Sequence, residues 1–139
     1  MPAAKVYELH GTMDWAYCLA CRRRYPMDEV KAWFAAGVAV SECGACGGAL
    51  KPAVVFFGES LPPAVLAEAK RRSENCDLFA VVGSSLVVYP AAYLPEEALW
   101  AGARLVIVNL TPTHLDGRAE VVLRGKAGEV MAELVARPG

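Results

Sequence analysis

The chain has 139 residues, of which 55% are hydrophobic and 21% are charged. This composition is typical of a globular protein that buries a core and excludes an extended disordered chain. The 14 lysines and arginines nearly balance the 15 aspartates and glutamates, which leaves a formal net charge of −1 and no global positive field for nucleic acid or an anionic membrane. The length favours one domain, or one domain with a small additional module.

Two stretches of the sequence bear on its location. The N-terminal residues show no apolar signal-peptide core behind a basic start. Residues 78–95 carry no charge, but Gly83, Pro90 and Pro95 divide them into strand and loop lengths rather than a membrane span. Five cysteines in such a chain favour metal binding in a reducing compartment over disulfide bonds. We therefore expect a cytoplasmic protein without a membrane partner.

The first half of the chain predicts short elements around two cysteine pairs. Residues 5–9 predict an extended segment that ends at His10-Gly11. Between the cysteine pairs, residues 27–37 predict one helix, in which Asp28 can cap the start and Gly37 ends the last turn. Residues 53–58 then predict a compact apolar strand or buried extended segment.

The second half predicts alternating helices and strands. Helices are expected from Pro62-Pro63 to about residue 72, over 95–102 and over 129–135, and strands over 78–82, 104–108 and 119–123. The continuous apolar run at 78–82 is typical of a parallel strand covered on both faces. The alternation predicts an α/β fold with a partial Rossmann-like, doubly wound parallel sheet. Three strands are fewer than the roughly four to six of a typical sheet, so the sheet looks incomplete.

Two C-x-x-C pairs are the strongest chemical signal in the sequence. They are Cys18/Cys21 and Cys43/Cys46, separated by 21 residues, close to the spacing of a tetrahedral zinc site. Four sulfur ligands fill the coordination shell and leave no open position for water or substrate, so the zinc is expected to be structural. Redox-active or incidental cysteines remain the alternative. Cys76 lies outside the pattern and is interpreted as a buried apolar residue.

The cysteine spacing also predicts the domain organisation. A four-cysteine zinc-ribbon module over residues 18–51 is inserted into a partial Rossmann-like part formed by residues 1–17 and 52–139. Arg22-Arg23-Arg24 follows the first pair directly, and zinc ribbons often bind nucleic acid. We expect no interleaving of these arginines with aromatic residues along one face and no continuous track for phosphates. The run is therefore interpreted as a solvated basic turn, with no specific nucleic-acid partner.

His10 and two strand ends are weaker candidates for chemistry. His10 lies where an extended segment meets the zinc module, a junction of the kind that forms clefts, and a neutral imidazole there could accept a proton from a hydroxyl group. A lone histidine is more often structural. Gly83-Ser84-Ser85 and Asn109 follow buried strands at the carboxyl edge, where open α/β sheets bind ligands. Such turn residues are also common without any ligand.

Five ordered motifs resemble the carboxyl-terminal part of bacterial sirtuins, which are NAD-dependent protein-lysine deacylases. The resemblance covers nearly the whole chain from about Val6. The motifs are Glu8-Leu9-His10-Gly11, the four-cysteine pattern, the segment from Lys51 to Pro62, the segment from Gly83 to Pro90, and Val108-Asn109-Leu110-Thr111.

The resemblance implies a role for each motif. His10 is implied as the catalytic base, acting on a ribose hydroxyl of NAD, and the acyl group then leaves on ADP-ribose. The channel for the acyl-lysine protein or peptide is implied to be lined by Val55, Phe57, Gly58, Glu59 and Val88. The cofactor is implied to be held by Gly83, Ser84, Ser85, Asn109, Leu110 and Ala127.

Three sirtuin motifs do not occur in this sequence: a Gly-Ala-Gly-x-Ser loop, a Gly-Ile-Pro-Asp-Phe-Arg segment and a Gln-Asn-Ile-Asp motif before the histidine. We therefore expect a deacylase without the amino-terminal half of its NAD site, with little activity alone. Either it needs a separate amino-terminal sirtuin half or self-association, or the sequence is one part of a longer gene. The first alternative is a catalytically inactive zinc-containing peptide-binding or interaction module. The second is a zinc-ribbon nucleic-acid adaptor.

Overall fold

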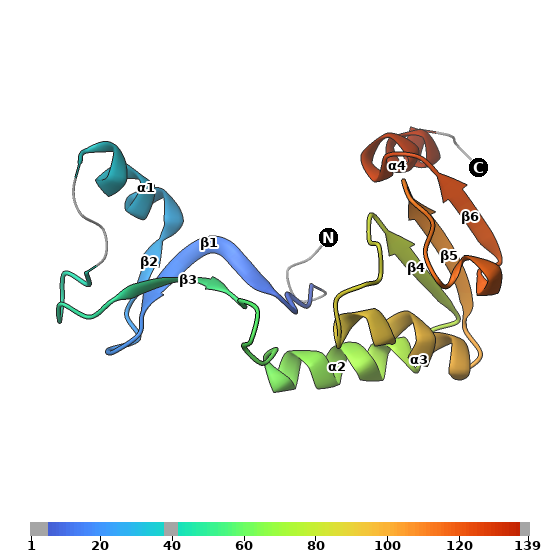
Figure 1. Cartoon of the computed structure of the whole chain (residues 1–139), viewed down its shortest axis with the longest axis horizontal. Helices are drawn as coiled ribbons and strands as arrows, with labels where there is room; N and C mark the ends of the chain where they lie inside the picture. Colours follow the sequence, from blue (N-terminus) through green and yellow to red (C-terminus); the bar gives the residue numbers. More distant parts are fainter. Residues whose placement is uncertain (1–5, 38–41, 137–139) are drawn as a thin grey trace. The chain divides into compact units, whose positions relative to one another are not determined.

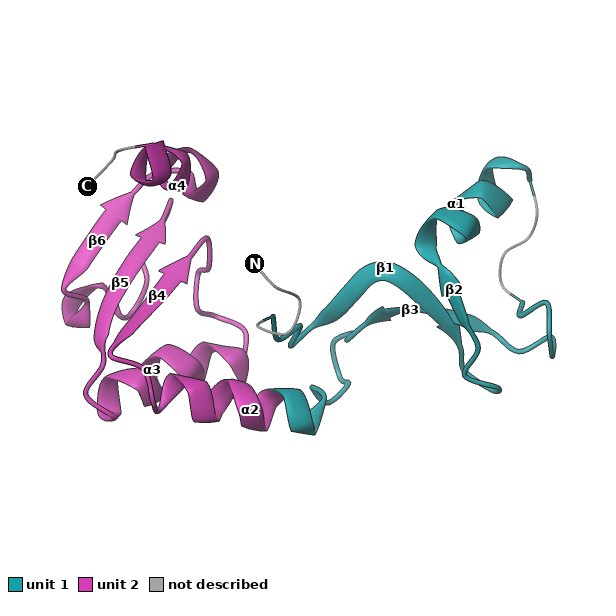
Figure 2. Ribbon diagram, turned by 180° about the vertical axis from the view of Figure 1, so that it is seen from behind, with its two compact units in different colours: residues 1–65 teal, residues 66–139 magenta. Residues whose placement is uncertain are grey.

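The computed structural model describes residues 6–37 and 42–136. It contains two compact units, Met1–Val65 and Leu66–Gly139, which divide the chain inside a helix (Figure 2). The finer division into a zinc module at 18–51 and a surrounding NAD-binding part stays a prediction. Within the described ranges, no helix has both the length and the apolar character needed to cross a membrane.

Unit 1 is built on a small antiparallel sheet. Its elements are β1 (Gly11–Cys18), β2 (Arg24–Pro26), α1 (Met27–Ala35) and β3 (Leu50–Val54) (Figure 1). The central strand β1 pairs antiparallel with both neighbours, in the order β2-β1-β3. One face of this sheet and α1 enclose a core cluster that consists of Ala16, Cys18, Tyr25, Met27, Val30 and Cys43, with Trp33 and Leu50 packed against it. Two of the predicted zinc ligands therefore belong to the core of this unit.

The structure corrects several predicted boundaries in unit 1. Residues 6–8 form no strand, Leu9 and His10 lie in a turn, and β1 begins only at Gly11, so His10 precedes a strand instead of following one; residue 5 lies outside the described residues. Asp28 does not cap α1, because Pro26 occupies the N-cap position and no side-chain cap bond is present. The predicted end of α1 is confirmed: Gly37 has a φ of 73° and its N–H donates to the Phe34 carbonyl at 3.0 Å.

Unit 2 contains a parallel three-stranded sheet. Its elements are α2 (Pro63–Ser73), β4 (Leu78–Val82), α3 (Leu94–Trp100), β5 (Arg104–Asn109), β6 (Val121–Arg124) and α4 (Ala127–Ala136), with 3-10 helices η2 (Ala91–Tyr93) and η3 (Asp116–Arg118). The strands run parallel in the order β4-β5-β6, and Val106 pairs with both Ala80 and Val121. The predicted α/β fold with a parallel sheet is therefore confirmed.

The two faces of the parallel sheet differ in burial. One face packs into a core cluster formed by Val81, Leu86, Ala92, Leu105, Ile107 and Leu115, with Phe79 and Val122 against it. On the other face, Leu78 is 50% exposed, Val82 43% and Val121 42%. The prediction that β4 is covered on both faces is wrong for the part of the chain that the structure describes, because Leu78 and Val82 remain exposed on this second face.

Candidate functional site

The two cysteine pairs fold into matching turns. In each turn the residue after the second cysteine donates its N–H to the carbonyl of the first: Arg22 to Cys18 at 3.0 Å and Gly47 to Cys43 at 2.8 Å. Both donors have positive φ, 63° for Arg22 and 69° for Gly47. Glycine adopts this conformation freely, whereas arginine is strained in it. The strained backbone at Arg22 is part of the turn that places both sulfur atoms of the pair in one cluster.

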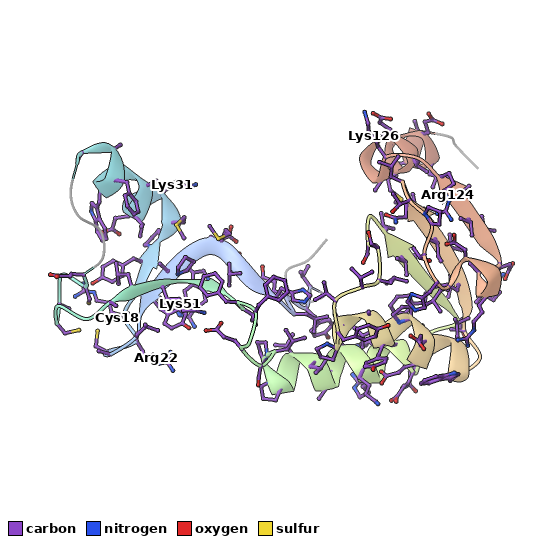
Figure 3. The ribbon with its side chains drawn as sticks, in the orientation of Figure 1. Cys18, Arg22, Lys31, Lys51, Arg124 and Lys126 are labelled. Carbon is purple, nitrogen blue, oxygen red and sulfur yellow. The ribbon has the colours of Figure 1, made fainter. Side chains whose placement is uncertain are left out.

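The four cysteine sulfurs meet in one cluster at the end of β1, where Cys18 is labelled in Figure 3. They all lie within 4.8 Å of one another, with Cys18–Cys46 at 3.5 Å and Cys21–Cys43 at 3.7 Å. A tetrahedral zinc ion with Zn–S bonds of about 2.3 Å sets sulfurs about 3.8 Å apart. A Cβ on Gly48 would lie 2.8 Å from the Cys18 sulfur, so this cradle requires glycine. The predicted ligand set is therefore brought together with spacings that fit zinc.

Hydrogen bonds and crowding set the charge of the sulfurs. The Tyr25 hydroxyl, 3.0 Å from Cys43 Sγ, lowers the pKa of the Cys43 thiol to about 6. The backbone N–H of Cys21, 3.4 Å from Cys18 Sγ, lowers the Cys18 pKa. The Gly48 backbone favours the Cys46 thiolate, but the neighbouring thiols outweigh it and raise the pKa of Cys46 to about 12. Four thiolates this close repel one another, and a bound cation relieves the repulsion.

His10 lies in the turn immediately before β1, and its side chain is exposed. Its backbone is clamped against β3 and the residue after it: the Val55 N–H donates to the His10 carbonyl at 2.9 Å, and Gly11 pairs with Val54. Gly11 has a φ of 75°, and a Cβ there would lie 1.9 Å from the Ala53 carbonyl oxygen. Pairing of β1 with β3 therefore fixes the predicted base next to the start of the predicted acyl-lysine segment.

The predicted acyl-lysine segment in unit 1 is a loop held by one carboxylate. Glu59 accepts hydrogen bonds from Lys51 Nζ and from the Phe56 N–H, both at 2.8 Å. The Lys51 ammonium lowers the pKa of Glu59, and the Glu59 carboxylate raises the pKa of Lys51. Phe57, at the tip of the loop, is 97% exposed. The remaining member, Val88, belongs to unit 2 and is also exposed.

The predicted cofactor residues gather at the carboxyl edge of the parallel sheet. Gly83, with a φ of 65°, donates its N–H to the Val108 carbonyl at 2.8 Å, and its Cβ would lie 3.2 Å from that of Ala127 at the start of α4. Asn109 is buried and donates from Nδ2 to the Thr111 carbonyl at 2.9 Å. The other predicted members, Ser84, Ser85 and Leu110, directly follow these strand ends and are exposed.

The comparisons with known proteins identify the family. The model of the Sir2 family matches residues 2–90. The chain belongs to the Sir2 family. It is 48% identical over 132 residues to NAD-dependent protein deacylase 2 of Archaeoglobus fulgidus, covering 94% of the chain and 52% of the relative. It is 47% identical over 133 residues to NAD-dependent protein deacetylase 2 of Streptomyces coelicolor, covering 96% and 55%.

Solved structures agree with this Sir2-family membership. A structure described as Sir2Tm bound to a propionylated peptide has a TM-score of 0.87 at 38% identity and covers 94% of this chain and 55% of that one. A structure described as Sir2-p53 peptide-NAD+ has a TM-score of 0.84 at 38% identity and covers 96% and 57%. The chain spans about half the length of the curated relatives it matches.

In this Sir2-family chain, sequence reasoning missed an arginine at the same sheet edge. Arg124, at the end of β6, donates to the Thr111 carbonyl at 3.1 Å and forms an ion pair with Asp116 (Figure 3). Thr113 in turn donates to Asp116 at 2.8 Å. This network braces the loop that follows Asn109. The pairing of Asn109 with Arg124 across β5 and β6 is the feature that points to this arginine, and it becomes known only once the register of the two strands is known.

The structure also corrects the expectation for the arginine run. The Arg24 guanidinium lies 4.1 Å from the Trp15 ring centroid, and Arg22 lies 5.2 Å from that of Tyr17. Tyr17 pairs with Arg24 on one side and with Lys51 on the other, so cations and aromatic rings do interleave on one sheet face. The alternation of side chains along β1 is the signal that would have revealed this face. The absence of a nucleic-acid partner stays a prediction.

Proposed function

We propose that this chain is part of an NAD-dependent protein-lysine deacylase that transfers the acyl group to ADP-ribose. The relatives in the comparisons are named NAD-dependent protein deacylases and deacetylases, and the matching structures are described as carrying acylated peptides and NAD. The observation that carries the proposal is the hydrogen bond between the Val55 N–H and the His10 carbonyl, 2.9 Å long. It joins the candidate base directly to the candidate acyl-lysine segment.

His10 would act as the general base of the reaction. Its imidazole is exposed and, among the described residues, makes no side-chain hydrogen bond, so a ring nitrogen is available to take a proton from a ribose hydroxyl. The substrate lysine would be received by the segment that contains Val55, Phe57, Gly58 and Glu59, together with Val88. Residues 56–59 of this segment are exposed, which suits contact with an extended peptide.

The cofactor would be bound at the carboxyl edge of β4 and β5 by Gly83, Ser84, Ser85, Asn109, Leu110 and Ala127. The close approach of Gly83 to Ala127, with no larger side chain at either position, leaves backbone accessible to a ribose or phosphate group. NAD, when bound, supplies the ribose that receives the acyl group. The buried Asn109 and the bracing of its loop would keep the adenosine side of this edge in one conformation.

Cys18, Cys21, Cys43 and Cys46 would hold one structural zinc ion. Their sulfur spacings support a tetrahedral shell, and four thiolates leave no coordination position for substrate. The ion would tie the turn after β1 to the turn before β3. It would thereby stabilise the sheet that positions His10 and Val55.

We further propose that activity needs an amino-terminal sirtuin half or self-association. The open sheet face around Leu78, Val82 and Val121 supports such association, because exposed apolar area of this kind favours it. The same face and the exposed loop at Phe57 also support the second candidate, an inactive zinc-containing peptide-binding or interaction module. We also propose a cytoplasmic location, which the five cysteines favour because free thiols persist in a reducing compartment.

A complementation assay tests the proposal. The chain is mixed with the separately produced amino-terminal half of Archaeoglobus fulgidus NAD-dependent protein deacylase 2, and loss of the acetyl group from an acetyl-lysine peptide is followed with NAD present. We expect turnover in the mixture, little in the chain alone, and none in the mixture that carries His10→Ala. A mixture that associates and binds the peptide without turnover would reject the deacylase and favour the interaction module.

A further inference from the structure

Tyr25 carries a hydroxyl group into the core of unit 1. Its side chain comes from β2 and is buried. The ring packs edge-on against Trp33 of α1, with centroids 5.4 Å apart and planes at 69°, and the Arg23 guanidinium lies 5.8 Å from its centroid. These contacts fix the position of the ring. The hydroxyl therefore has a defined place and little freedom to seek another partner.

The partner of this hydroxyl is a candidate zinc ligand. Tyr25 Oη lies 3.0 Å from Cys43 Sγ, and both residues are buried. A buried hydroxyl group requires a hydrogen-bond partner, and a thiolate can only accept, so the Tyr25 O–H donates to the Cys43 sulfur. The remaining cysteines differ: Cys18 accepts from the backbone N–H of Cys21 at 3.4 Å, while Cys21 and Cys46 are exposed.

We propose that Tyr25 is a positioning residue of the metal site, whose hydroxyl orients the Cys43 thiolate and strengthens binding of the ion. The inference rests on the proposed zinc site. An oriented hydrogen bond holds the sulfur toward the other three and disperses part of the negative charge that crowds the cluster. Because Trp33 packs on the same ring, the metal site is also linked to α1 through Tyr25. Outer partners of this kind change metal affinity by roughly 10- to 100-fold.

Tyr25→Phe in the full chain tests this role, because it removes one oxygen and keeps the ring. The matched control is Tyr17→Phe: it also removes a tyrosine hydroxyl from the same sheet, on the face that contacts Arg22 and Lys51. Each protein is loaded with zinc, and transfer of the ion to a chromogenic chelator is measured. We expect zinc affinity to fall about 10- to 100-fold in Tyr25→Phe and to stay within about twofold in Tyr17→Phe.

A second measurement separates the hydrogen bond from a packing role. With cobalt(II) in place of zinc, the sulfur-to-metal charge-transfer band reports the electron density on the thiolates and is read in the metal-loaded protein, whatever the stability of the metal-free form. Loss of the hydrogen bond should shift this band to lower energy in Tyr25→Phe and leave it unchanged in Tyr17→Phe. An unchanged cobalt spectrum or wild-type zinc affinity in Tyr25→Phe overturns the inference. A wild-type chain that binds no metal instead rejects the zinc site itself.

Discussion

Replacing Gly11 with alanine should break the clamp that holds His10. Gly11 has a φ of 75°, and a Cβ at this position would lie 1.9 Å from the Ala53 carbonyl oxygen, so β1 and β3 must separate there. The left-handed backbone costs about 1 to 2 kcal/mol with a Cβ present. Loss of the hydrogen bond from Val55 to His10 costs about 1 kcal/mol more. We expect the free energy of unfolding of unit 1 to fall by at least about 2 to 3 kcal/mol, as the sum of these two costs.

Gly37→Ala is the matched control for this change. Gly37 has nearly the same φ, 73°, but no atom of the described residues lies within 4 Å of a Cβ built there. It should show only the backbone cost. Thermal unfolding of unit 1 is therefore expected to place the Tm of Gly11→Ala roughly 4 to 8 °C below that of Gly37→Ala. Hydrogen exchange at the Val55 amide should accelerate only in Gly11→Ala. Equal Tm values and a protected Val55 amide in both variants would refute the reasoning.

Three further changes probe the metal site, the base and the loop carboxylate. The wild-type chain should bind about one zinc ion; Cys43→Ala combined with Cys46→Ala should abolish this, and zinc retained by the double variant on metal analysis would contradict the ligand set. In the complemented enzyme, His10→Ala should lower turnover by about 10² to 10⁴-fold at unchanged Tm, and normal turnover would exclude a base role. Lys51 lowers the pKa of Glu59, so their pairing stabilises unit 1 at neutral pH and this contribution fades as the pH falls below about 4. Glu59→Gln should therefore flatten the acid side of a plot of Tm against pH, and an unchanged slope would contradict the pairing.

Unit 2 was largely predictable because its elements carry strong local signals. The apolar run at 78–82 coincides with β4, and the run at 104–108 with all but the last residue of β5. Prolines at the helix starts marked α2 to within a residue. Which face of the sheet is covered was not predictable, because it depends on what packs there rather than on the strand itself.

Unit 1 was harder to predict because its structure depends on the cysteine cluster and on pairing between strands that are far apart in the sequence. The eight residues of β1 end at Cys18, and Trp15 and Tyr17 alternate there with small residues rather than with polar ones, so the strand lacks the usual apolar–polar pattern. The predicted strand at 53–58 overlaps β3 only at residues 53 and 54, since the chain then bends into the loop held by Glu59. The clustering of the four cysteines was predictable from their spacing alone. The Tyr25 contact was not, because it needs β2, whose strand character appears only in its pairing with β1.

The fate of the acyl group tests the central proposal most directly. An acetyl-lysine peptide and NAD are incubated with the chain complemented by an amino-terminal half, and both products are quantified by mass spectrometry. We expect the acetyl group on ADP-ribose, with one NAD consumed for each acetyl group removed, and no such product from the chain alone. Free acetate without NAD consumption, or an intact acetyl-lysine peptide in a complex that binds both NAD and peptide, would contradict the account.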